Sequence, residues 1–173
     1  STPTSTPTTE SFMSEKPVRH SATHATFVID REYAASPSRV YAAWSDQETK
    51  ARWFVGPDGW KQSDHTLDFR IGGREHLSGG PPAGPLHIYD AVFQDIVPNE
   101  RIVSTYEMHL DDNRISVSLA TLEFEPAGKG TRLVYTEQGV FLDGYDDAGS
   151  REHGTRELLD KLGIALGNAG ASL

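Results

Sequence analysis

Glu137 and His153 are the residues whose types and positions could support acid–base chemistry. Glu137 follows Leu133 and Tyr135 on one face of a predicted strand, so a carboxylate continues an apolar row. If this row faces a cavity, the carboxylate is partly desolvated and could transfer protons; the alternative is an exposed strand end. His153 lies in a polar stretch of the last predicted helix, where it could be a general base near a cavity opening or an ordinary surface histidine. These two residues are the catalytic candidates.

Three large aromatic side chains occur in the stretch YAAWSDQETKARWF, at Trp44, Trp53 and Phe54. Large aromatic residues usually fill the core of a small domain. Trp53 and Phe54, however, end a predicted helix directly before the turn-forming sequence VGPDGW, where a cavity mouth could lie. We therefore expect Trp44 to pack in the core and Trp53 and Phe54 to wall a cavity. Replacing Trp53 with alanine should then weaken ligand binding more than it lowers stability.

Asp68 and Arg70 are two residues apart in the stretch DFRIGG. They could orient a ligand carboxylate, but opposite charges at this spacing commonly pair with each other, which favours a structural ion pair. Gly72 and Gly73 follow and most simply permit a tight turn. They lack the strand-to-helix context of a phosphate-binding loop.

Several kinds of chemistry are excluded by composition and motif. The chain has 0 cysteines, which rules out disulfides, thiol nucleophiles and thiolate metal sites. The 7 histidines do not show the H-E-x-x-H spacing, and the sequence has neither a nucleophile elbow nor a Walker loop. His20 and His24 are one helical turn apart, but Pro17 and the missing apolar periodicity favour a solvated tail over a metal site. We expect no metal and no cofactor.

Charge and hydropathy limit the partners. The formal net charge of −9 and the isoelectric point near 5.2 oppose binding to nucleic acid. No apolar run approaches the roughly 20 residues that span a bilayer, and the N-terminus lacks the layout of a signal peptide. We expect a soluble, cytoplasmic protein with no nucleic-acid partner and no membrane insertion.

Residues 1–24 are predicted to form a flexible leader, and residues 25–173 a single domain. The first stretch, STPTSTPTTESF, is rich in Ser, Thr and Pro and has almost nothing to bury. Its composition changes abruptly at Met13, which favours a remnant of the expression vector over a native linker. The rest of the chain is long enough to bury a substantial core.

Two short helices are predicted after a first strand in ATFVIDREYAA, whose residues alternate between a drier and a wetter face. Ser36 is the expected N-cap of the first helix, and Pro37 fits its first helical position. The second helix is expected to start at Ser45, because Ser45 and Glu48 have the capping-box spacing.

About six antiparallel strands are predicted to follow Trp60, separated by Gly-, Pro- and Asn-containing turns. The final element is a helix that ends at Gly167, polar in its first half and apolar on one face of its second half. A single long helix against a curved antiparallel sheet is an α+β helix-grip arrangement.

The stretches SPSRVYAAWSDQETKARWF, LDFRIGG, DAVFQDIVPNERIVSTYE, GTRLVYTEQG and HGTRELLDKLG resemble, in order and spacing, the family named after the activator of heat-shock protein 90 ATPase. This family lies within the START/Bet v 1-like superfamily, and the resemblance extends over residues 26–166. It implies a curved antiparallel sheet of about six to seven strands wrapped around a long C-terminal helix. It also implies a cavity between them, which in relatives holds lipids, sterols, polyketides or plant hormones. Many relatives have Trp after the helix glycine, where this chain has Thr155 after Gly154, so the resemblance implies a larger or more polar pocket here.

The leading hypothesis is that a small hydrophobic or aromatic molecule binds in this cavity. The first alternative is an enzyme of the cyclase or hydrolase type that uses Glu137 or His153 in the same cavity. The second is a module that interacts with a chaperone partner through its outer surface, and an exposed strand edge would also permit a homodimer. The predicted ligand-binding residues are Trp53, Phe54, Tyr106, Glu137, His153 and Thr155.

Overall fold

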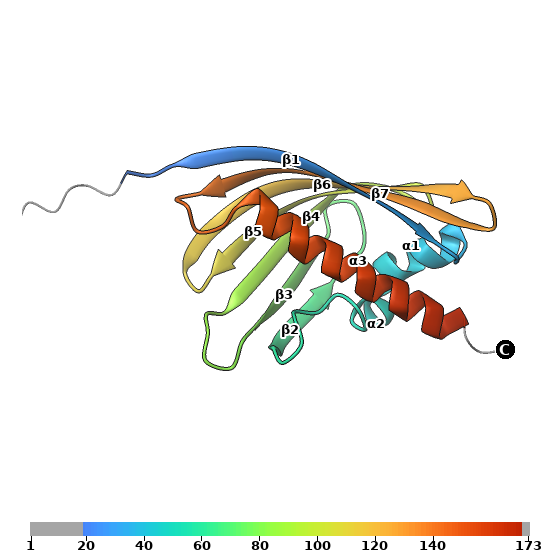
Figure 1. Cartoon of the computed structure of the whole chain (residues 1–173), viewed down its shortest axis with the longest axis horizontal. Helices are drawn as coiled ribbons and strands as arrows, with labels where there is room; N and C mark the ends of the chain where they lie inside the picture. The colour runs from blue at the N-terminus through green and yellow to red at the C-terminus, as the bar shows by residue number, and fades with distance from the viewer. Residues whose placement is uncertain (1–18, 171–173) are drawn as a thin grey trace, which may run out of the picture.

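The computed structural model describes residues 19–170 and confirms the predicted helix-grip α+β fold. A curved antiparallel sheet arches over one long helix, with two short helices near one end of the sheet (Figure 1). The elements are β1 (Ala22–Tyr33), α1 (Pro37–Ser45), α2 (Gln47–Lys50), β2 (Lys61–Leu67), β3 (Arg74–Gly80), β4 (His87–Val97), β5 (Arg101–Leu110), β6 (Asn113–Ala127), β7 (Gly130–Leu142) and α3 (Ala148–Gly170). None of the helices in this part of the chain combines the length and the hydropathy needed to cross a membrane.

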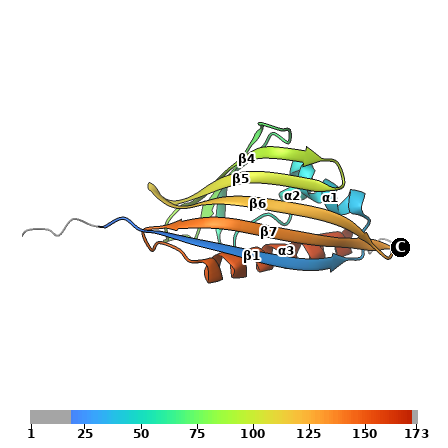
Figure 2. The ribbon, with the colours of Figure 1, turned by 90° about the horizontal axis from the view of Figure 1, so that it is seen from above.

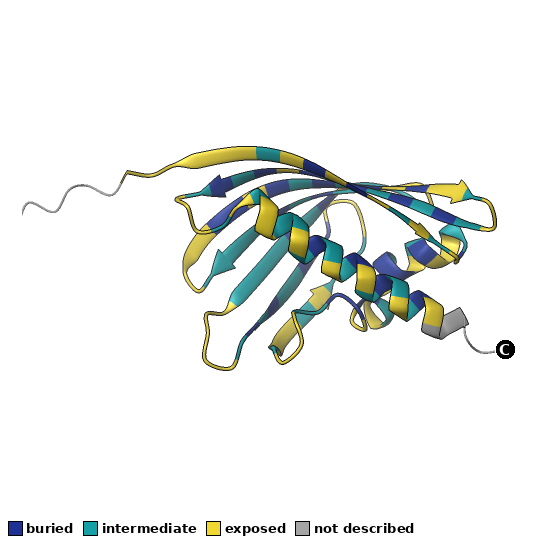
Figure 3. Cartoon of the chain, in the orientation of Figure 1, coloured by how far each residue is buried: buried dark blue, intermediate teal, exposed yellow. Residues whose placement is uncertain are grey.

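The sheet has seven strands in the order β1-β7-β6-β5-β4-β3-β2, and every neighbouring pair is antiparallel. The strands from β2 to β7 form a meander, and β1 returns to pair with β7 along its full length. The first strand of the chain therefore lies beside the last one (Figure 2). Buried and less buried residues alternate along β7, as expected for a sheet with one packed face (Figure 3).

Two capping side chains start the short helices. Ser36 is the N-cap of α1, with its hydroxyl accepting from the Arg39 amide, and Pro37 occupies the first turn, as predicted. The predicted cap of α2 is wrong by one residue, because the Asp46 carboxylate, not Ser45, accepts from the Thr49 amide at 2.9 Å. A carboxylate can cap a helix as well as a hydroxyl can, so the capping-box spacing alone did not decide between these neighbours.

The first strand begins at Ala22, three residues before the predicted domain start at Ala25. Ser21 and His20, which we expected in a solvated tail, contact Asp143: the Ser21 amide donates to Oδ1 at 2.8 Å, and His20 Nδ1 lies 3.1 Å from Oδ2. The rest of the predicted leader, residues 1–18, lies outside the described residues.

Helix α3 packs against β1 and α1. Leu159, Leu162 and Leu166 are buried on its inner face, which matches the predicted apolar second half. The Tyr33 hydroxyl donates to the Leu159 carbonyl oxygen at 2.8 Å, and Arg31 forms an ion pair with Asp160. The helix is thus attached along the β1 edge of the sheet.

Trp53 is the largest fully buried side chain among the described residues, with 0% of its surface exposed. Its indole Nε1 donates to the Ala43 carbonyl oxygen at 3.0 Å, so the polar atom is satisfied. Its ring also meets the edge of Trp44, with the ring centroids 4.5 Å apart. These contacts give Trp53 a structural role at the junction of α1 and α2.

We predict that Trp53→Ala lowers the free energy of unfolding by about 3–5 kcal/mol, because it leaves a large cavity and an unpaired carbonyl. Urea denaturation measures this loss. Trp60→Ala is the matched control, since Trp60 is partly exposed and its loss should destabilise the protein much less. Similar losses for the two variants would contradict the structural role of Trp53.

Candidate ligand-binding cavity

A cavity of about 700 Å³ lies between the concave face of the sheet, the first half of α3 and the segment 55–62. This volume is within the usual range for small-molecule sites, roughly 300–1,000 Å³. Its wall is mainly apolar. Prominent apolar residues lining it are Trp44, Phe54, Phe93, Met108, Leu122 and Leu158.

The segment 55–62 and the polar half of α3 both line the cavity. Lys161 of α3 donates to the Gly56 carbonyl oxygen at 2.9 Å and so ties the helix to this segment. The Trp60 ring packs against the His87 ring of β4 at an angle of 44°, with the ring centroids 4.3 Å apart. Burial lowers the pKa of His87, against the raising effect of Asp146 and Asp111.

The structure changes the predicted position of one indole. Phe54, Tyr106 and Thr155 line the cavity. Trp44 packs in the core as predicted and also lines the cavity, whereas Trp53, which we predicted in the cavity wall, does not line it. Trp53 is enclosed on all sides instead. The reason is that the chain turns tightly after α2, with the Phe54 amide bonded to the Lys50 carbonyl oxygen, so consecutive aromatics point to different sides.

His153 is exposed on α3 and does not line the cavity. Its side chain is 76% exposed, and Nε2 lies 3.1 Å from the Glu157 carboxylate, one helical turn away. The structure therefore favours the surface interpretation of His153 over a role as general base.

Glu137 is completely buried just behind the cavity wall. The Tyr106 and Tyr135 hydroxyls both donate to its Oε1, at 2.6 and 2.7 Å. The Ser118 hydroxyl donates to Oε2 at 2.9 Å, and Arg151 approaches the same oxygen at 3.4 Å. We call these five residues the Glu137 network. Its carboxylate is held by four donors, which explains how a charge can be buried here.

Arg151 joins α3 to the network and also lines the cavity. Its side chain is 10% exposed and donates to the Tyr106 hydroxyl at 3.0 Å and to Ser116 at 2.7 Å. It also pairs with Asp146 at 3.0 Å. One guanidinium therefore faces two carboxylates, those of Asp146 and Glu137, and its charge is compensated within the protein.

The two tyrosines of the network remain protonated donors. Burial, followed by the charge of Glu137, raises the pKa of Tyr106. Burial is also the main cause of the raised pKa of Tyr135, with the nearby Tyr106 and Glu137 adding to it. Both hydroxyls thus keep the protons that they donate to the carboxylate.

A second buried ionic group, absent from our predictions, consists of Lys50, Glu75 and His65, and we call it the Lys50 cluster. Lys50 Nζ lies 2.7 Å from Glu75 Oε1, and His65 Nε2 lies 2.9 Å from Oε2. Lys50 and Glu75 both line the cavity, and the ammonium sits over the Phe54 ring, 4.5 Å from its centroid. The cluster comes from a helix and two strands, so no local spacing pointed to it. The signal in the sequence is a carboxylate, Glu75, inside a segment predicted to be a strand.

Several polar groups of the wall are available to a ligand. Ser78, Ser104 and Tyr89 line the cavity, and their hydroxyls form no side-chain hydrogen bond within residues 19–170. The indole Nε1 of Trp44 also has no partner in that part of the chain, but this atom is enclosed by the protein and is not open to the cavity. These neutral groups contrast with the buried charges, which are all paired.

We predict that Lys50→Met lowers the free energy of unfolding by about 3–5 kcal/mol, because it leaves the Glu75 carboxylate buried without its main counter-charge. The double variant Lys50→Met/Glu75→Gln removes both charges and should recover most of this loss. Urea denaturation of the two variants and the unchanged protein provides the comparison. An equal loss in the double variant would show that the charges are not coupled.

The loss of stability at acid pH should also differ between the unchanged protein and this double variant. Burial by itself raises the pKa of Glu75, but Lys50 and the hydrogen bond from His65 hold it below its ordinary value of 4.5. A lowered carboxyl pKa contributes stability above pH 4.5 that is lost as the pH falls through the folded-state pKa. Urea denaturation at a series of pH values should therefore show a steeper acid loss for the unchanged protein. Parallel curves would contradict this assignment.

Comparisons with known proteins agree with this architecture. An uncharacterized protein of known structure from Rhizobium leguminosarum is 49% identical, with 87% of this chain and 99% of that chain covered and a TM-score of 0.83. Mll3558 from Rhizobium loti is 48% identical, covering 84% of this chain and 99% of its own, with a TM-score of 0.78. CV1439 from Chromobacterium violaceum shares the fold at 24% identity, a TM-score of 0.70, and coverage of 82% and 96%.

Among curated proteins, none matches the chain. The profile of the Activator of Hsp90 ATPase homolog 1-like family, in contrast, matches residues 34–167. This match spans both short helices, strands β2 to β7 and most of α3, so it includes every residue assigned to the cavity above. The chain therefore belongs to the Activator of Hsp90 ATPase homolog 1-like family.

Proposed function

We propose that the protein binds a small hydrophobic or aromatic molecule in the cavity between the sheet and α3. The observation that carries this proposal is the cavity of about 700 Å³ with a mainly apolar wall and a few convergent polar groups. Such a space costs stability unless something occupies it, because its lining side chains lack packing partners.

The buried charges support an uncharged polar end for this molecule. Lys50 is paired with Glu75, and Arg151 is paired with Asp146 and Glu137. Neither of these two buried cations has a free positive charge to offer a ligand carboxylate or phosphate. The other two lysines that line the cavity, Lys61 and Lys161, are not buried. The hydroxyls of Ser78 and Tyr89 can instead hydrogen-bond a hydroxyl or carbonyl group.

A catalytic role is less well supported by the geometry than binding. The Glu137 carboxylate is already held by four donors and lies behind Tyr106 and Tyr135, which separate it from the cavity. His153, the other candidate, faces away from the cavity. We therefore place binding first.

Two fluorescent probes test both parts of the proposal. N-phenyl-1-naphthylamine is uncharged, and 8-anilino-1-naphthalenesulfonate adds a sulfonate to the same aromatic skeleton. We expect the uncharged probe to bind at least about tenfold more tightly, since a tenfold difference needs only about 1.4 kcal/mol. Measurements at high salt screen the net negative charge of the protein surface, so the comparison reports on the cavity.

Met108→Trp fills the cavity and should abolish binding of the uncharged probe. Val103→Trp is the matched control, because Val103 lies on the same strand but does not line the cavity. Equal probe binding in the two variants would contradict binding in the cavity. Tighter binding of the sulfonate, lost in Arg151→Met, would contradict the uncharged polar end while leaving the cavity as the site.

A further inference from the structure

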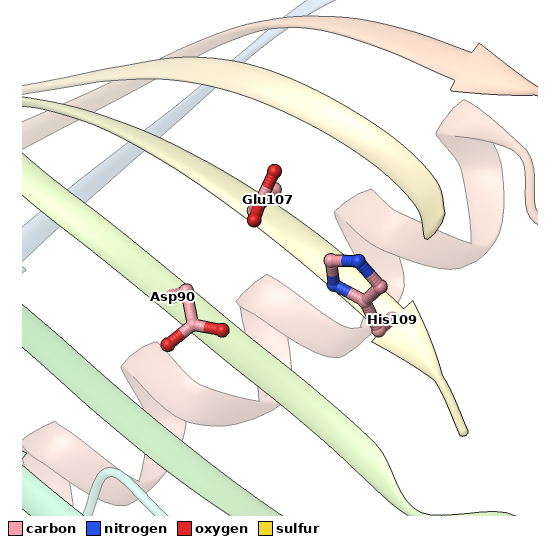
Figure 4. A group of neighbouring side chains, drawn as sticks. All are labelled: Asp90, Glu107 and His109. Atoms are coloured by element: carbon pink, nitrogen blue, oxygen red, sulfur yellow. The ribbon is translucent and has the colours of Figure 1, made fainter. Parts of the chain in front are cut away.

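Asp90 of β4 and Glu107 and His109 of β5 gather on one face of the sheet (Figure 4). Asp90 and Glu107 are direct cross-strand partners, and His109 lies two residues further along β5. Tyr106 and Met108, the neighbours of Glu107 in the chain, line the cavity. Because side chains alternate along a strand, Glu107 points to the opposite, outer face of the sheet. We call these three residues the outer-face cluster.

The outer-face cluster brings three possible metal-ligand atoms near one another. One oxygen or ring nitrogen from each residue lies within 4.8 Å of the corresponding atoms of the other two. Within residues 19–170, His109 forms neither a hydrogen bond nor an ion pair with either carboxylate. Donors to a tetrahedral ion with bonds of about 2.1 Å lie roughly 3.4 Å apart. The three side chains would therefore have to move closer together to share one ion.

His76 supports the cluster from the neighbouring strand. Its Nδ1 lies 2.6 Å from Asp90 Oδ1, and the register places His76 directly opposite Asp90 on β3. A hydrogen bond between a histidine and a ligating carboxylate is a common way to orient a metal ligand. Arg114 Nε lies 3.2 Å from Oε2 of Glu107. Arg114 would therefore compete with a metal ion for this carboxylate.

We propose that Asp90, Glu107 and His109 bind a divalent transition-metal ion such as Zn²⁺, with His76 as a positioning residue. One imidazole and two carboxylates form a mixed ligand set that suits Zn²⁺, Co²⁺ or Ni²⁺. Ca²⁺ and Mg²⁺ prefer ligand sets made of oxygen alone. This departs from our expectation of no metal, which rested on local histidine spacing; here the ligands meet through strand pairing.

Isothermal titration of the full chain with ZnCl₂, in a buffer that does not bind zinc, tests the proposal. We expect one Zn²⁺ per chain, loss of that binding in His109→Asn and in Asp90→Asn, and no comparable binding of Ca²⁺ or Mg²⁺. His76→Gln should keep the stoichiometry and weaken the affinity about 10–100-fold. His153→Asn is the matched control, since this exposed histidine lies on α3, and its titration should equal that of the unchanged chain.

Thermal melting supplies a second measurement that does not depend on the titration. Zn²⁺ should raise the melting temperature of the unchanged chain and of His153→Asn, but not of His109→Asn. All substitutions are at partly exposed or exposed positions, so the variants should fold without zinc. Binding that persists unchanged in both His109→Asn and Asp90→Asn, or no binding by the unchanged chain, would overturn the proposal.

Discussion

A single helix cannot cover the concave face of a curved seven-stranded sheet, and the rest of the structure follows from this constraint. Helix α3 packs against β1 and α1, so it follows one side of the sheet (Figure 2). The concave face nearer β3, β4 and β5 is left to the short segment 55–62, which reaches α3 through the bond between Lys161 and Gly56. The space that remains is the cavity of about 700 Å³.

Polar groups beside this cavity must be satisfied by the protein, because the space around them is largely apolar. The Glu137 network and the Lys50 cluster meet this requirement in the same way, with each carboxylate fixed by a cation and additional donors. Both contain residues from distant parts of the chain, so they also hold α2 and α3 in position against the strands. Their internal pairing leaves neutral hydroxyls, such as those of Ser78 and Tyr89, among the polar groups that line the cavity.

The sequence was sufficient to predict the fold, but only part of the site. Alternation in the strands, the Ser36 cap and the apolar face of α3 are local patterns, and the structure confirms them. The enclosure of Trp53 away from the cavity was not predictable, because it depends on the tight turn after α2. Lys50 and Glu75 are 25 residues apart, and their contact depends on how α2 docks beside β3. The outer-face cluster likewise exists only through the pairing of β4 with β5.

The most direct test of the account is an NMR spectrum of protein labelled with ¹³C at the methionine methyl groups, recorded with and without N-phenyl-1-naphthylamine. The chain has 2 methionines: Met108 lines the cavity, and Met13 precedes the domain. Binding in the cavity predicts a shift of the Met108 signal, because an aromatic ring would lie against its methyl group, with no change at Met13. An unshifted Met108 signal under conditions where the probe is bound would contradict the account.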